Sequence, residues 1–270
     1  DKVTLMVYMV GSDLESDGGA ASEDIAEMTA ANADNINITL QTGGAAAWEN
    51  ASISDGKTER HIIKNGELQN VANLGETQMT SPNTLTDFIK WSASNYPADR
   101  YELVLWNHGG GTALGFGYDE MYPDDMLSLS QIGNALSDSG IKFDIVGFDA
   151  CLMGTIETAY MLEPYADYLV ASEEYEPGTG WYYSEWLKNL SDNTSMPTVE
   201  IGKKIVEDYI NGPDSSFFDS NTLSIVDLRE IPYTYSKLCE TMQQEEGVLD
   251  SRYSVISQAR YNAKSFGDGE

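Results

Sequence analysis

One of the two histidines and one of the two cysteines of the chain each follow an apolar run. His108 lies in ELVLWNHGGGTALGF (102–116), directly before three glycines, and Cys151 ends FDIVGFDAC (143–151). An imidazole beside a thiol can take the thiol proton during attack on a carbonyl carbon and can later protonate a leaving amine. The two residues therefore predict acyl-transfer chemistry, provided that the fold brings them together.

The residues next to this pair fit the same chemistry. A tetrahedral intermediate needs backbone N–H donors aimed at its oxyanion. Gly109 has no side chain to block a substrate and can expose its N–H, and we expect the N–H of Cys151 to be the second donor. We also expect Cys151 to lie at the start of a helix, whose N-terminus would favour the thiolate.

Apolar runs of strand length alternate with helical patterns along the chain, as in a parallel α/β sheet. We expect strands at 3–11, 36–44, 100–108, 142–151, 166–174 and 221–228. We expect helices at 22–32, 81–97, 128–140, 154–165, 198–212, 229–246 and 251–265. Two Gly-centred turns within 52–75 indicate a small β-meander beside the sheet.

This order predicts a three-layer α/β/α fold with a mostly parallel, about six-stranded central sheet and the small β-meander. Residues 1–270 contain no repeat or linker, so we expect one domain, and we expect it to continue beyond the last residue given. Ligands of open parallel sheets bind at the carboxyl ends of the strands. Consecutive strands joined by a helix are usually neighbours. His108 and Cys151 should therefore face one crevice.

Charge narrows the range of partners. The chain has 15 Lys and Arg against 44 Asp and Glu, for a formal net charge of −29. Such a surface repels phosphate backbones, so we expect no nucleic-acid binding, and it attracts cationic ligands.

No apolar run reaches the ~18 residues of a membrane span. We interpret the start at Asp1 as that of a mature chain, and the two cysteines do not indicate a disulfide framework.

Other interpretations stay open. A single His or Cys is usually structural, as we expect for His61 in the meander and Cys239 in a helical stretch. HGGG after a strand could bind phosphate, but G-x-G-x-x-G and the P-loop Lys are absent. A non-catalytic cell-surface binding module with the same fold is the main alternative to an enzyme.

The stretches LVLWNHGGG and GFDACLMG resemble the His and Cys motifs of the clostripain family of cysteine peptidases, in the clan of caspases, gingipains and legumain. YMVGSDLES and ADYLVASEEYEPGTGWYY extend the resemblance over most of the chain. It implies a caspase-like fold, a Cys–His dyad and cleavage of proteins or peptides after Arg or Lys. It also implies a bacterial protein that is secreted or held at the cell surface.

By matching position, His108 would be the general acid/base, Cys151 the nucleophile and Gly109 an oxyanion donor. Asp149 would receive the P1 side chain, and its carboxylate could pair with a guanidinium or an ammonium. A cap on the following helix is the other role open to Asp149. Weaker candidates for substrate binding border the same crevice: Ser12, Asp13, Glu173 and Glu174.

The chain departs from the family in the segment between its two motifs. Family members commonly cut themselves there after a basic residue, but residues 109–141 contain no Lys or Arg. Self-cleavage is therefore not expected in this segment.

The chemistry needs no cofactor. Calcium dependence occurs in the family, although no loop of the D-x-[DN]-x-[DN]-G kind is present here. We expect a monomer.

Overall fold

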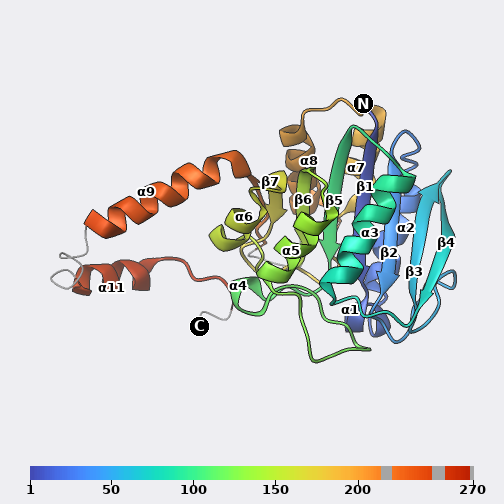
Figure 1. Cartoon of the computed structure of the whole chain (residues 1–270), viewed down its shortest axis with the longest axis horizontal. Coiled ribbons are helices and arrows are strands. Elements are labelled where there is room, and N and C mark those ends of the chain that lie inside the picture. The colour runs from blue at the N-terminus through green and yellow to red at the C-terminus, as the bar shows by residue number, and fades with distance from the viewer. Residues whose placement is uncertain (214–220, 245–252, 268–270) are drawn as a thin grey trace.

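The computed structural model describes residues 1–213, 221–244 and 253–267, and its centre is one eight-stranded sheet (Figure 1). The strand order is β4-β3-β2-β1-β5-β6-β7-β8. In chain order the strands are β1 (Val3–Val10), β2 (Asn37–Gly43), β3 (Thr58–Lys64), β4 (Glu67–Gly75), β5 (Arg100–Trp106), β6 (Phe143–Asp149), β7 (Ala166–Ala171) and β8 (Ser224–Asp227).

The middle of the sheet is parallel and both of its edges are antiparallel. β2, β1, β5, β6 and β7 run in one direction, whereas β3, β4 and β8 pair antiparallel. The expectation of about six strands was wrong. The segment interpreted as a separate meander forms β3 and β4, which extend the same sheet from β2.

Helices cover both faces of this sheet and complete the predicted three layers (Figure 1). Alternate residues of β1 enter opposite cores, with Leu5 and Val7 in one and Met6 and Tyr8 in the other. The first core is closed by α2 (Ala20–Ala30), α7 (Tyr183–Asp192) and α8 (Thr198–Asn211). The second is closed by α3 (Pro82–Asn95), α5 (Leu129–Ser139) and α6 (Ile156–Leu162).

Local signals explain where several helices begin and end. α5 starts at a capping box formed by Ser128 and Gln131, and it ends at Gly140 in the left-handed conformation. α3 has Pro82 in its first turn. α7 was not predicted. Two short helices, α1 (Ser12–Ser16) and α4 (Gly111–Leu114), lie in the connections that follow the carboxyl ends of β1 and β5.

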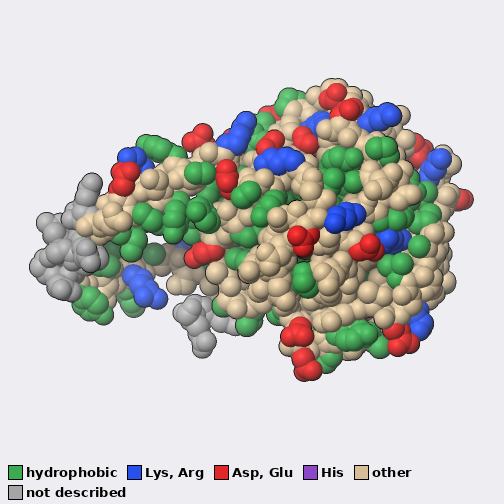
Figure 2. All heavy atoms as spheres, viewed as in Figure 1, with side chains coloured by type: hydrophobic (Ala, Val, Ile, Leu, Met, Phe, Trp, Pro, Cys, Tyr) green, Lys and Arg blue, Asp and Glu red, His purple; other side chains and the backbone are tan. Residues whose placement is uncertain are grey.

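Two further helices, α9 (Ile231–Gln244) and α11 (Tyr253–Asn262), extend away from the three-layer body (Figure 1). They agree with the helices expected at 229–246 and 251–265, of which residues 245–252 lie outside the described residues. Their hydrophobic side chains stay largely exposed, as for Tyr233 and Val255, and Figure 2 shows hydrophobic side chains along this part of the molecule. In the described part of the chain, no helix has the length and apolar character to span a membrane.

Candidate active site

The pairing of β5 with β6 brings His108 and Cys151 to one edge of the sheet. The two strands are parallel, and their register sets Trp106 beside Asp149. His108 and Cys151 each lie two residues beyond this pair. The N–H of Asn107 donates to the carbonyl of Asp149 at 3.2 Å, which extends the strand pairing past the last strand residue.

His108 and Cys151 line one cavity of about 350 Å³, large enough for a long side chain. The residues around it come from α1, from the ends of β5 and β6 and from the loop after β7. They are Leu14, Trp106, Asn107, His108, Asp149, Ala150, Cys151, Tyr175, Glu176, Pro177, Gly178 and Gly180. None of these described lining residues is Lys or Arg, so the cavity itself supplies carboxyl groups without basic partners.

The Cys151 thiol is half-buried, and its surroundings favour the protonated form. Burial raises the pKa of Cys151, and the carboxylates of Asp149 and Glu174 add to this, although the N–H of Glu176 donates to Sγ at 3.2 Å. Cys151 lies in a turn, and α6 begins only at Ile156. The expectation that Cys151 starts a helix was therefore wrong, and the thiol needs a base to ionise it.

Gly109 lies against the backbone of the cysteine. A Cβ atom at position 109 would be 2.0 Å from the carbonyl oxygen of Cys151 and 3.0 Å from Cγ of Met153. No side chain fits in that space. In the described residues, the N–H groups of Gly109 and Cys151 donate to no other residue, and the N–H of Cys151 interacts with its own Sγ.

The imidazole of His108 is held from two sides. Nε2 lies 2.8 Å from Oδ1 of Asp13, and the ring packs edge-on against Tyr118 with centroids 6.3 Å apart. The neighbouring Asn107 is buried, and its amide donates to the carbonyl of Val10 and to Oγ of Ser12. Asn107 also accepts from the N–H of Tyr118.

Asp149 lies in the wall of the cavity and is buried. Its carboxyl accepts from the N–H of Trp181 at 3.2 Å and from the hydroxyl of Tyr183 at 2.8 Å. It does not cap the following helix, whose N-cap is Thr155. Burial raises the pKa of Asp149 to about 7, even though these hydrogen bonds favour its charge.

A second carboxyl group, Glu176, shares the cavity and was missed by the sequence analysis. Both of its oxygens are buried and accept no hydrogen bond from the described residues. Burial, followed by the charges of Asp149 and Cys151, raises the pKa of Glu176 well above its usual range. No motif marks Glu176. Its only signal in the sequence is its place two residues beyond Glu174, in the stretch EEYEPG.

The other residues predicted for substrate binding lie around the cavity rather than in its lining. Ser12 is buried and accepts from Asn107, while Asp13 faces His108. Glu173 accepts from the hydroxyl of Ser224, and Glu174 accepts from the N–H of Gly267 at 2.8 Å.

The second His and the second Cys lie elsewhere in the fold. His61 is buried in β3, where Nε2 contacts Oγ1 of Thr42 at 3.0 Å, and burial lowers its pKa to about 4. Cys239 lies in α9 and is a free thiol. Neither residue takes part in the site.

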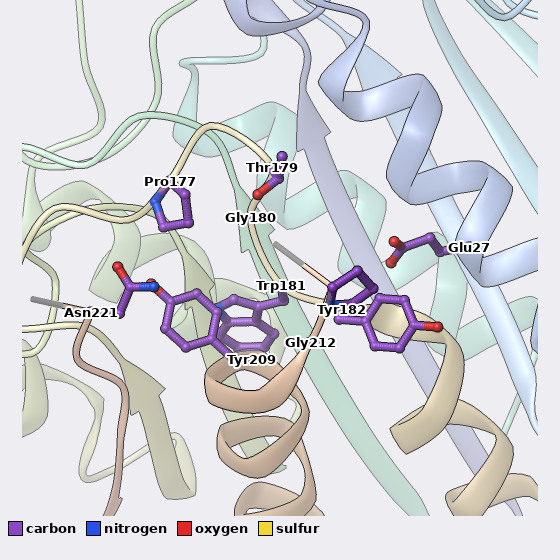
Figure 3. A pocket seen from close by; sticks show the side chains of 10 residues that line it. Glu27, Pro177, Thr179, Gly180, Trp181, Tyr182, Tyr209, Gly212 and Asn221 are labelled. Carbon is purple, nitrogen blue, oxygen red and sulfur yellow. The ribbon is translucent and has the colours of Figure 1, made fainter. Parts of the chain in front are cut away.

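A smaller hollow shares Pro177 and Gly180 with the cavity that His108 and Cys151 line. It lies between Glu27, Tyr182 and Tyr209 (Figure 3). Its volume is about 20 Å³, enough for a single water molecule. In the described part of the chain, no group of three or more His, Cys, Asp or Glu is placed to hold a metal ion.

Comparisons with known proteins point to one family. Residues 7–264 match the clostripain family, Peptidase C11. The chain is 36% identical over 128 residues to clostripain of Hathewaya histolytica, a match that covers 41% of this chain and 24% of the relative. The chain thus spans about a quarter of the length of that curated relative.

Solved structures show the same fold. A secreted C11 cysteine protease from Bacteroides thetaiotaomicron, in complex with an irreversible peptide inhibitor, is 23% identical with a TM-score of 0.68; the match covers 86% of this chain and 67% of that one. An inactive zymogen C11 protease from Parabacteroides distasonis is 22% identical with a TM-score of 0.65, over 86% of this chain and 63% of that one. The caspase-like fold is confirmed.

The contact between Gly109 and Cys151 can be tested by Gly109→Ala. The added methyl group would overlap the carbonyl oxygen of Cys151, which is backbone and cannot rotate away. Overpacking of this kind costs about 1–3 kcal/mol, so Tm should fall by roughly 3–10 °C in a thermal melt. Gly133→Ala in α5 is the matched control, because its methyl group meets only the flexible Met161 side chain. Equal Tm values for Gly109→Ala and wild type would contradict the close approach.

Proposed function

Because the chain belongs to the clostripain family, we propose that it is a cysteine endopeptidase that cleaves peptide bonds after Arg or Lys. The observation that carries the proposal is the shared cavity. It combines a thiol, an imidazole and two buried carboxyls, and Gly109, outside its lining, packs against the carbonyl of Cys151. These are the groups that acyl transfer from a cationic peptide requires.

In the proposed reaction, Sγ of Cys151 attacks the scissile carbonyl carbon while His108 takes the thiol proton. The N–H groups of Gly109 and Cys151 stabilise the resulting oxyanion. The C–N bond then breaks, and the imidazolium gives its proton to the leaving amine. Water, activated by the same imidazole, hydrolyses the thioester and releases the acid product and the thiol.

The two buried carboxyls support the basic P1 specificity. Asp149 and Glu176 have raised pKa values because burial leaves their charges without solvent. A guanidinium or ammonium in the cavity would supply the missing countercharge and favour both carboxylates. A neutral P1 side chain would leave them protonated and gain nothing from them.

The remaining parts of the proposal follow from the family. We infer protein or peptide substrates, a monomer, and a bacterial chain that is secreted or held at the cell surface. The secreted description of the Bacteroides thetaiotaomicron protease supports this location. No step of the proposed reaction requires a metal.

The dyad is tested by Cys151→Ala and His108→Ala. Cys151→Ala should abolish turnover of a fluorogenic Arg-ended peptide and labelling by an acyloxymethyl ketone, because it removes the nucleophile. His108→Ala should lower kcat by roughly 100-fold or more through loss of the general acid/base. Cys239→Ser, which removes the other thiol, should keep both activities. Turnover retained by Cys151→Ala would reject the assignment, and a wild type without turnover would favour a binding module.

The P1 pocket is tested by Asp149→Asn and Glu176→Gln. Each should lower kcat/KM by roughly 100-fold or more for Arg- and Lys-ended substrates but little for neutral ones, because a buried cation loses its partner. Glu185→Gln removes an exposed charge at the start of α7 and should change neither. An unchanged P1 profile in both cavity variants would move the pocket to other carboxylates.

The same pocket predicts a pH dependence of binding. Burial raises the pKa of Asp149 to about 7. The Asp149 carboxyl is therefore mostly protonated at about pH 5.5 and mostly ionised at about pH 8.5. In Cys151→Ala, calorimetry should show tighter binding of an Arg-ended peptide at the higher pH. A norleucine-ended peptide should show no such gain, and equal affinities for the Arg-ended peptide at the two pH values would count against an ionised pocket.

The segment between the two motifs should stay intact. It holds no Lys or Arg for a pocket that selects them, so the purified protein should remain one chain through 109–141 on storage. Intact-mass measurement over time checks this. Spontaneous cuts within 109–141 in wild type, absent from Cys151→Ala, would contradict the link between pocket charge and self-processing.

A further inference from the structure

The carboxylate of Asp13 determines which ring nitrogen of His108 carries the proton. Nε2 of His108 lies 2.8 Å from Oδ1 of Asp13. Partial burial alone would raise the pKa of Asp13, but the hydrogen bond and the charge of His108 hold it below the usual range. An ionised carboxylate can only accept, so Nε2 must carry the proton. In the neutral imidazole, Nδ1 is then the nitrogen that can take another proton.

The loop around Asp13 is built to hold this contact. Asp13 belongs to α1, and the preceding Ser12 has a φ of 53°, in the left-handed region. Oγ of Ser12 accepts from the amide of Asn107 at 2.8 Å, so α1 is tied to the residue directly before His108. At the other side of α1, the buried Glu15 accepts from the N–H groups of Ser22 and Glu49. These bonds distinguish the contact from an isolated surface ion pair.

The state of the thiol explains why this contact matters. Burial raises the pKa of Cys151, so the nucleophile waits as a thiol and transfers a proton as it attacks. That transfer creates an imidazolium at His108. A carboxylate 2.8 Å from the ring favours the imidazolium and keeps the ring from rotating.

We propose that Asp13 is a positioning residue that orients His108, fixes its Nε2–H tautomer and stabilises the imidazolium formed when Cys151 attacks. This inference rests on the roles proposed above for Cys151 and His108. It replaces the substrate-binding role expected for Asp13 from the sequence. Leu14, not Asp13, is the part of α1 that lines the cavity.

The kinetic test compares Asp13→Asn, Asp13→Glu and Asp17→Asn. Asp13→Asn should lower kcat by roughly 10- to 100-fold with KM nearly unchanged, since the ring loses its anionic partner and not a substrate contact. Asp13→Glu should restore part of the loss. Asp17→Asn removes the same charge from an exposed position at the end of α1 and should behave as wild type. A loss confined to KM, or a kcat within about twofold of wild type, would overturn the proposal.

Combination with His108→Ala separates a role through the imidazole from an independent one. If Asp13 acts through His108, Asp13→Asn should lower the residual kcat of His108→Ala no further. Additive losses would overturn the positioning role.

A spectroscopic test works even if the peptidase proposal fails. The chain has two histidines, so ¹⁵N NMR of the imidazoles gives two sets of signals. In wild type, neutral His108 should be the Nε2–H tautomer, and in Asp13→Asn it should become a mixture, while the signals of the buried His61 stay unchanged. The same tautomer distribution at His108 in both proteins would overturn the inference. By contrast, a normal tautomer shift in a protein without turnover would reject only the peptidase proposal.

Discussion

The parallel pairing of β5 with β6 decides where His108, Cys151 and Asp149 lie relative to one another. With Trp106 beside Asp149, the chain leaves both strands at the same level, and His108 and Cys151 emerge side by side. Backbone pairing continues through Asn107 and brings Gly109 against the carbonyl of Cys151. Because the side-chain period of a strand is two, a one-residue slip would turn Asp149 away from the cavity and separate the two motifs. The register of these central strands therefore fixes the relative positions of Asp149 and the two motifs.

Electrostatics impose the second constraint. Asp149, Glu176 and Asp24 are buried carboxyls whose pKa values burial raises, and Asp24 accepts from the indole N–H of Trp106 at 2.6 Å. Charged carboxylates buried together repel one another, which favours their protonated forms. The charges of Asp149 and Glu174 also disfavour the thiolate of Cys151. A bound cation would favour the ionised carboxyls of this cavity, and a base is needed to ionise its thiol.

Sequence patterns predicted the parts of the molecule that depend on local order. Unbroken apolar runs marked β1, β5 and β6, and the residues at their ends were the right ones to place at a shared edge. The aromatic and polar mixture in WYYSEWLKNLSD hid α7, and Gly-centred turns in 52–75 predicted the hairpin but not its addition to the main sheet. Contacts between distant loops carry no local signal: Asp13 meets His108 across 95 positions, and Glu176 becomes a cavity residue only through the path of the loop after β7.

The segment 109–141 crosses one face of the sheet through α5, whereas the strands that it joins are already neighbours. Backbone hydrogen bonds and a shared apolar core hold β5 to β6 independently of that connection. A break in the exposed turn around 121–125 would therefore leave two fragments bound as a noncovalent complex, each contributing one half of the dyad. The fold is suited to split-protein complementation, in which separately produced halves would recover a site only by rebuilding the central strand pair.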